Sequence, residues 1–166
     1  MSALFGFHNL NECPVRPETL TIAKQIMYRR GHVYAESIVS DRVGIGFVAN
    51  HPGEGSFYQH SDTSIVAIAD ARLDNRDTLI GLLRLGRPDV SNAEIITAGY
   101  LKWGIGCLRY LEGDFAFVIW DPQDSQMFCA RDRMGLKQLL YHYDSGKIFA
   151  FSTDAKAIFA LSLIHI

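Results

Sequence analysis

Hydrophobic residues occur in alternating or nearly continuous short runs over much of the chain, a pattern that predicts strands. The predicted strands are Met1–His8, Val33–Val39, Val43–Ala49, Thr63–Ala69, Phe115–Trp120, Gln126–Ala130, Leu139–Tyr143 and Lys147–Phe151. The run at 115–120 has no polar alternation, which indicates a strand covered on both faces. Turn-forming residues such as Asp144-Ser145-Gly146 separate neighbouring runs and predict hairpins.

Other segments have the 3.6-residue period of helices, namely 19–27, 75–84, the segment that follows Ser91, and 154–161. Ser91 and Glu94 have the spacing of a capping box, and Asn75 or Asp74 is a candidate N-cap. Leu79, Leu82 and Leu83 are predicted to face inward, as are Ile95, Ile96, Gly99, Tyr100 and Trp103. The sequence therefore predicts an α+β fold in which two packed antiparallel sheets carry helices on their outer faces.

Composition limits the function classes without changing this fold. The chain has 166 residues, is 48% hydrophobic and has a net charge of −2, which fits one globular domain and argues against a nucleic-acid partner. No apolar run approaches the roughly 20 residues that span a bilayer. The three widely spaced cysteines, Cys13, Cys107 and Cys129, indicate a reducing compartment, so we expect a cytoplasmic protein. His51, His60 and Asp62 fit no compact metal motif, and no metal site is expected.

Several segments, in order along nearly the whole chain, resemble the N-terminal glutamine amidotransferase domain of asparagine synthetase B-type proteins. The two that carry most of the resemblance are Leu111–Phe117 with Trp120-Asp121, and Ala130–Lys137 (ARDRMGLK). Ala71–Asp77 (ARLDNRD), Ser91–Glu94 and Phe151–Ala157 (FSTDAKA) support it. The resemblance implies a class II amidotransferase with an N-terminal nucleophile hydrolase fold, a four-layer αββα sandwich. Asp114 and Asp132 are expected to pair with Arg131 or Arg133, or to cap local backbone.

The resemblance also implies a chemistry, and the chain departs from it at the first position. Active members begin Met-Cys, and after removal of the methionine the cysteine thiol attacks the amide of glutamine with its own α-amine as base. Ser2 occupies the place of that nucleophile. A hydroxyl is much harder to deprotonate than a thiol, so Ser2 is a weak replacement.

The implied oxyanion and substrate positions depart as well. Where the family has Asn-Gly-Glu, this chain has Asp70-Ala71-Arg72, so a carboxylate replaces an amide donor and a cation replaces the carboxylate that holds the ammonium group of glutamine. Asn92 replaces a family aspartate that binds glutamine. The strand at 43–49 lacks the family's central arginine, and the Arg-Gly-Pro-Asp loop is reduced to Arg30-Gly31-His32. Joint loss of these groups indicates a natural, degenerate domain.

Residues 1–161 are interpreted as one amidotransferase-type domain, and 162–166 as an apolar tail at a truncation point. The leading hypothesis is a domain without efficient glutamine hydrolysis in an ATP-dependent amide- or lactam-forming enzyme, like that of β-lactam synthetases and lasso-peptide cyclases. Its expected partner is a C-terminal synthetase domain of the same protein, where ATP and Mg²⁺ would bind, and this domain itself needs no cofactor. The alternatives are an active, divergent glutaminase that binds glutamine and uses Ser2, and a stand-alone interaction module.

Overall fold

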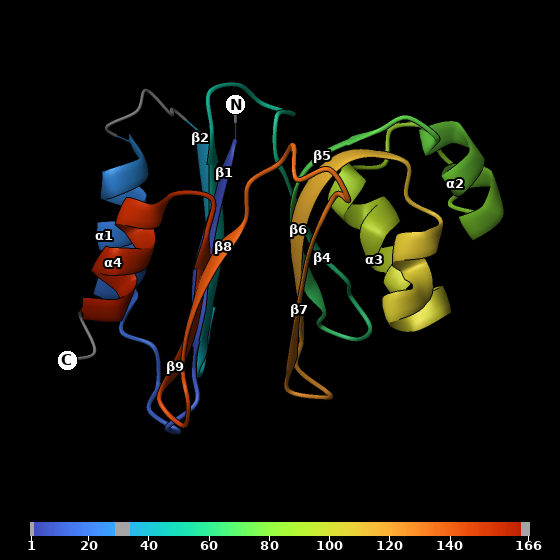
Figure 1. Ribbon diagram of the computed structural model, residues 1–166. Helices are drawn as coiled ribbons and strands as arrows, with labels where there is room; N and C mark the ends of the chain where they lie inside the picture. The colour runs from blue at the N-terminus through green and yellow to red at the C-terminus, as the bar shows by residue number, and fades with distance from the viewer. Residues whose placement is uncertain (1, 29–33, 164–166) are drawn as a thin grey trace. The chain divides into compact units, whose positions relative to one another are not determined.

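The computed structural model describes residues 2–28 and 34–163, and these form two compact units. Unit 1 consists of Met1–Gly55 with Gln138–Ile166, and unit 2 consists of Ser56–Lys137. Each unit has an antiparallel sheet, helices and a hydrophobic core of its own (Figure 1). Two antiparallel sheets with flanking helices confirm the predicted α+β class and are compatible with the αββα sandwich.

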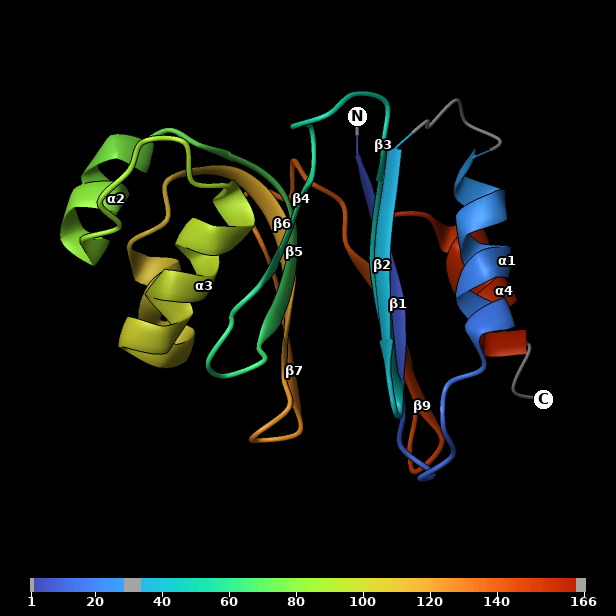
Figure 2. The same cartoon turned by 180° about the vertical axis from the view of Figure 1, so that it is seen from behind.

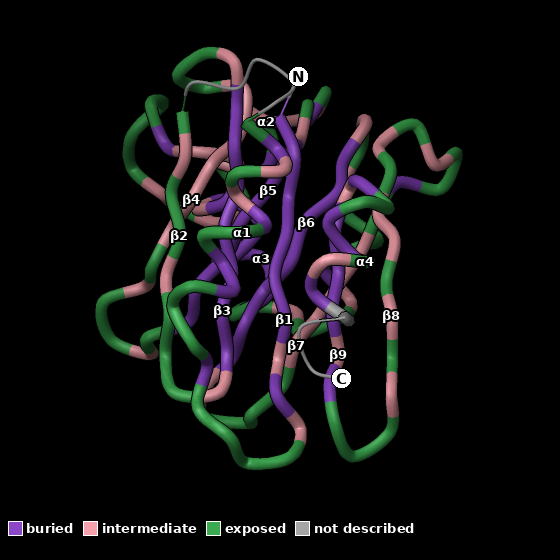
Figure 3. Tube along the Cα trace, turned by 90° about the vertical axis from the view of Figure 1, so that its left-hand side faces the viewer, coloured by how far each residue is buried: buried purple, intermediate pink, exposed green. Residues whose placement is uncertain are grey.

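Unit 1 is built on a five-stranded sheet with the strand order β2-β3-β1-β9-β8. Its strands are β1 (Ala3–Asn9), β2 (Tyr34–Ser40), β3 (Val43–Ala49), β8 (Leu140–Asp144) and β9 (Ile148–Ser152). Helices α1 (Pro17–Tyr28) and α4 (Ala155–Leu163) lie side by side on one face of this sheet (Figures 1 and 2). Strands β1 and β3 are buried along most of their length, whereas the edge strands β2 and β8 are largely exposed or half-buried (Figure 3).

The core of unit 1 forms where β1 meets the two helices. Phe5 and Phe7 on β1 are fully buried in one cluster with Leu20 and Met27 of α1. Gly44 on β3 allows the close approach of α1, because an added Cβ atom would lie 3.0 Å from the side chain of Leu20. Strands β1 and β3 are buried along almost their whole length, which agrees with their nearly continuous apolar sequence.

Unit 2 is built on a four-stranded sheet with the strand order β4-β5-β6-β7. Its strands are β4 (Ser56–Gln59), β5 (Val66–Leu73), β6 (Gly113–Asp121) and β7 (Gln126–Arg131). The helices α2 (Arg76–Leu83) and α3 (Asn92–Trp103) and the 3-10 helix η1 (Gly104–Arg109) lie on one side of this sheet (Figure 2). The N-cap prediction for α3 is confirmed, because the Ser91 side chain accepts a hydrogen bond from the backbone N–H of Glu94.

Strands β5 and β6 present two different faces. Ala67 and Ala69 of β5 and Phe115 and Phe117 of β6 belong to the core cluster that includes α3. Because successive strand residues point to opposite faces, the residues between these, such as Asp70, lie on the face turned away from α3. The ladder runs from Val66 opposite Trp120 to Leu73 opposite Gly113 and fixes which residues share a face.

The remaining elements agree with the sequence-based prediction to within a few residues, with specific exceptions. Strand β4 and helix η1 were not predicted. Leu79 is buried as expected, but the prediction that Leu82 faces inward is wrong, since 48% of this residue is exposed. Helix α2 has only eight residues, and its buried stripe is correspondingly narrow.

The β7–β8 connection is organised by one carboxylate. The backbone N–H of Asp132 donates to the carbonyl of Phe115 at 2.7 Å, and the two carboxylate oxygens of Asp132 accept from the backbone N–H groups of Leu136 and Lys137, each at 2.9 Å. Burial acts to raise the pKa of the Asp132 carboxyl, but the backbone hydrogen bonds from Lys137 and Leu136 outweigh it and leave this pKa below its ordinary value. The prediction that Asp132 caps local backbone is confirmed.

We expect Gly113→Ala to lower the free energy of unfolding by at least about 3 kcal/mol. Gly113 has φ +129°, and an added Cβ atom would collide with the carbonyl oxygen of Arg72 across the β5–β6 ladder. Gly106→Ala is the matched control, because no atom lies within 4 Å of a Cβ atom added there. Urea unfolding of both variants checks this, and equal losses would contradict it.

Replacement of Asp132 by Asn should lower the free energy of unfolding at pH 7 by about 1–3 kcal/mol, because an amide accepts at only one of its two ends. A pKa that is depressed in the folded state adds stability above the unfolded pKa of about 4, and this stability is lost as the pH falls through the folded pKa. The difference between wild type and variant should therefore narrow below about pH 4.

Denaturant titrations at several pH values measure this difference. Asp124→Asn, at an exposed position in the β6–β7 turn, is the control and should show little effect at any pH. A constant difference between wild type and Asp132→Asn down to pH 3 would mean that the carboxylate is not the source of the stability.

Candidate functional site

Ser2, the residue in the predicted nucleophile position, lies directly before β1 and is only 5% exposed. Its Oγ donates to the backbone carbonyl of Glu54 at 3.1 Å. Gly55 follows this carbonyl, and a Cβ atom added there would lie 3.1 Å from the Cβ atom of Ser2. A carbonyl accepts the hydroxyl hydrogen but is no general base, so this contact does not activate the oxygen.

The start of β1 is held by the segment after β9. The backbone N–H of Leu4 donates to Thr153 Oγ1 at 3.2 Å, and Leu4 O accepts from the Thr153 N–H at 2.9 Å and from Ser152 Oγ at 3.1 Å. Asp154 accepts from the N–H of Lys156 at the start of α4. The FSTDAKA segment therefore has a structural role in unit 1, which is to fix the strand that follows Ser2.

Asp70 lies on β5, and 9% of its side chain is exposed. The Nζ atom of Lys137 lies 2.7 Å from Asp70 Oδ1 and donates a hydrogen bond to it. The carboxylate is therefore held as half of an ion pair, and an ionised carboxylate has no hydrogen to donate to an oxyanion. Lys137 was not identified in the sequence as a site residue.

Arg72, two residues further along β5, is largely exposed and contacts two carboxylates. Its Nη2 lies 3.1 Å from Asp114 Oδ2, and its Nε lies 3.2 Å from Asp74 Oδ1. The prediction that Asp114 pairs with Arg131 or Arg133 is therefore wrong. Arg72 lies opposite Asp114 in the β5–β6 register and forms the ion pair with it. The cation at position 72 is neutralised within its own sheet.

Ala71 and Asn92 are brought together at the start of α3. Asn92 Nδ2 donates to the Ala71 carbonyl at 2.6 Å, and Asn92 Oδ1 accepts from Arg76 Nη1 at 2.7 Å. The same guanidinium donates to the carbonyls of Pro88 and Val90. Both ends of the Asn92 amide are thus used to connect α2, α3 and β5.

The predicted site residues are divided between the units. Asp70, Ala71, Arg72 and Asn92 belong to unit 2, and Ser2 belongs to unit 1. All seven residues of β3 are buried. The Nε atom of Arg42, the residue before this strand, lies 3.5 Å from Asp41 Oδ2. The reduced loop Arg30-Gly31-His32 lies outside the described residues, as do the side chains of the tail 162–166.

Metal and thiol chemistry find little support in the described residues. Among them, no group of three or more His, Cys, Asp or Glu side chains could hold a metal ion. His60 Nδ1 accepts from the backbone N–H of Thr63.

Burial raises the pKa of Cys107 to about 11 and that of Cys129 to about 12, so both thiols stay protonated and unreactive at neutral pH. None of the helices in the described part of the chain has the length and apolar character needed to cross a membrane.

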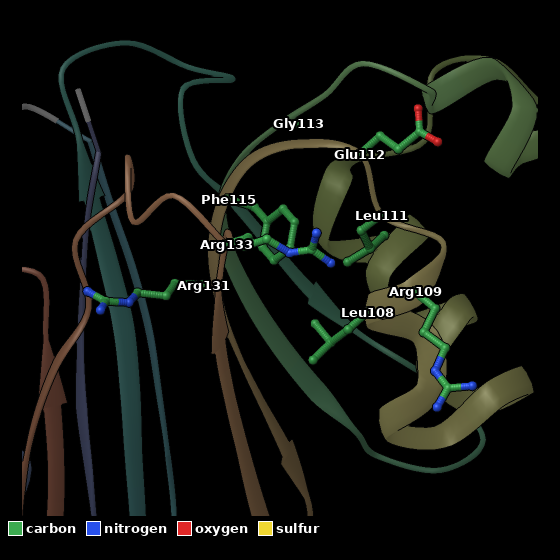
Figure 4. A pocket seen from close by; sticks show the side chains of 8 residues that line it. All are labelled: Leu108, Arg109, Leu111, Glu112, Gly113, Phe115, Arg131 and Arg133. Atoms are coloured by element: carbon green, nitrogen blue, oxygen red, sulfur yellow. The ribbon is translucent and has the colours of Figure 1, made fainter.

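A pocket of about 540 Å³ lies in unit 2 between η1, the start of β6 and the end of β7 (Figure 4). It is lined by Leu108, Arg109, Leu111, Glu112, Gly113, Phe115, Arg131 and Arg133. The guanidinium groups of its three arginines point in different directions, so their charge is not gathered at one point (Figure 4). None of the predicted site residues lines this pocket.

Comparison with known proteins identifies the wider group. Residues 41–160 match the glutamine amidotransferase domain family. The chain is 30% identical over 138 residues to the amidase chyE of Penicillium rubens, covering 81% of this chain and 20% of that protein. It is 39% identical over 70 residues to asparagine synthetase [glutamine-hydrolyzing] 3 of Bacillus subtilis, covering 42% of this chain and 11% of that protein.

A third relative is the amidase chry2 of Gibberella zeae, 38% identical over 73 residues, which are 44% of this chain and 11% of that protein. The matched segments thus span only between 11% and 20% of the length of these relatives. The family match covers most of the chain and includes β5, the strand that carries Asp70, Ala71 and Arg72. The chain therefore belongs to the glutamine amidotransferase domain family.

Proposed function

We propose that this chain is the amidotransferase-like domain of a larger, asparagine synthetase-like protein that forms amide or lactam bonds with ATP, and that the domain does not hydrolyse glutamine efficiently. The observation that carries this proposal is the Asp70–Lys137 ion pair at 2.7 Å, because the resemblance expects an amide donor at position 70. Loss of one oxyanion donor costs roughly 10²–10³ in rate.

The other site positions support the same proposal. Ser2 offers a hydroxyl in place of a thiol and donates it to a carbonyl. Arg72 forms ion pairs with Asp114 and Asp74. The Asn92 amide donates a hydrogen bond to the Ala71 carbonyl and accepts one from Arg76. Neither Arg72 nor Asn92 has the carboxylate that the resemblance implies for binding glutamine.

The proposed partner is a synthetase domain of the same protein, where ATP and Mg²⁺ would act. The length of the relatives supports it, since the matched segments span between 11% and 20% of them. In such a protein the substrate supplies its own amine, and this domain serves as a scaffold.

The free cysteines, of which Cys107 is buried and Cys13 exposed, support a cytoplasmic location.

A second candidate is an active glutaminase with Ser2 as nucleophile. One observation favours it: a relative that is 39% identical over 70 residues is named asparagine synthetase [glutamine-hydrolyzing] 3. This candidate requires removal of Met1, so that the α-amine of Ser2 is free to act as base.

Ammonia release from glutamine separates the two candidates. We expect no release above background from the wild type or from Ser2→Cys, because a restored thiol still lacks the donor at position 70 and the groups that bind glutamine. Removal of Met1 is verified by intact mass for both proteins, so that a blocked amine does not mimic a degenerate site.

Either positive result would change the conclusion. Release by the wild type would establish the glutaminase and overturn the degenerate domain. Release by Ser2→Cys alone would show that the binding site is intact and that the nucleophile is the only group lost.

A further inference from the structure

The Asp70 carboxylate needs a partner that its own motif, Asp70-Ala71-Arg72, does not provide. Only 9% of its side chain is exposed, and it lies on a strand whose neighbours are mostly apolar and buried. An ionised carboxylate removed from water costs several kcal/mol unless a cation and hydrogen bonds compensate it. An ionised Asp70 therefore requires a cationic residue close to it.

Lys137 is this residue. Its Nζ lies 2.7 Å from Asp70 Oδ1, within the range of charge-assisted hydrogen bonds, and 30% of its side chain is exposed. The described residues contain no other salt bridge to Asp70. Arg72, on the same strand, is already paired with Asp114 and Asp74.

The loop before Lys137 delivers the ammonium group to this place. The Lys137 N–H is bound to Asp132 Oδ2, and Asp132 is itself bound to the Phe115 carbonyl of β6. Gly135, with φ +68°, lets the loop turn back, and its N–H donates to Asp132 O. Because the backbone is fixed, less conformational entropy is lost when the side chain reaches Asp70.

We propose that Lys137 is the positioning residue of the degenerate site: its ammonium group neutralises the Asp70 carboxylate and holds it in the oxyanion position. The proposal rests on the proposed function, which assigns that position to residue 70. The Lys137 ammonium group, which could otherwise polarise a carbonyl there, is committed to Asp70. The pair thus leaves no net charge at this point of β5.

A double-mutant cycle tests the coupling. Lys137→Met should lower the folding equilibrium constant about 10- to 100-fold, because it leaves a buried charge unpaired while partial exposure moderates the loss. In the double variant Asp70→Asn/Lys137→Met the folding equilibrium constant should fall by a smaller factor than the product of the two single-variant factors, since Asn needs no cation. Purely multiplicative effects would overturn the proposal.

The matched control is the exposed pair of Lys147 and Asp144, whose Nζ–Oδ2 distance is 3.0 Å. The cycle of Lys147→Met and Asp144→Asn should give near-multiplicative effects, because exposed pairs contribute little. Equal coupling in the two cycles would mean that burial gives the Asp70 pair no special role.

Chemical rescue is a readout that mere packing does not move. In Asp70→Ala the Lys137 ammonium keeps its place and gains space, so sodium formate should raise the melting temperature by about 1–3 °C relative to sodium chloride at equal ionic strength. Wild type and Asp70→Ala/Lys137→Met should show no such difference. An equal response of all three proteins would overturn the positioning role.

These measurements do not use glutamine, so their outcome is independent of the ammonia assay. Strong coupling together with ammonia release would retain the ion pair and reject the degenerate domain. If there were neither coupling nor ammonia release, the role of the ion pair would be rejected and the degenerate domain retained. Ser2 and the lost glutamine contacts would then be the cause of inactivity.

Discussion

The antiparallel ladder between β5 and β6 is the constraint on which unit 2 and its candidate site depend. It sets Val66 opposite Trp120 at one end and Leu73 opposite Gly113 at the other. One face of the ladder supplies the aromatic and alanine side chains that α3 covers, and the other supplies the charged groups. Because side chains alternate, a shift of one residue would exchange these faces and bury the charges in the core.

The charges on this ladder are compensated locally. Asp70 has Lys137, and Arg72 has Asp114 and Asp74, so each charged residue that departs from the family pattern has an opposite charge within 3.2 Å. One loop motif that carries the family resemblance thereby gains a physical explanation in this chain. The ARDRMGLK segment is a backbone turn around Asp132 that ends in the cation needed by Asp70.

The sequence predicted the elements whose signal is local. Strand β3 has the predicted bounds, and the capping residue of α3 is Ser91 as expected, because apolar runs and cap residues act over a few positions. Strand β4 was missed because its four residues, Ser56–Gln59, carry too short a pattern. The predicted partners of Asp114 were wrong because proximity in sequence suggested Arg131 and Arg133, whereas cross-strand register selected Arg72.

Site chemistry was harder to anticipate, since it depends on contacts between distant positions. The resemblance identified Ser2, Asp70 and Arg72 as departures from the family pattern. They did not identify Lys137, which is 67 residues away from Asp70 in the chain. A buried aspartate in an apolar strand predicts that some cation exists, but only the folded loop selects which one.

The strand order of unit 1 has a consequence for synthesis on the ribosome. Strand β1 pairs with β3 and also with β9, whose residues 148–152 are made only after all of unit 2. Unit 2 is continuous, so all of its strands exist once residue 137 has emerged. Strand β1 therefore has one edge unpaired until β9 has been made, and in that interval the edge is exposed to wrong partners.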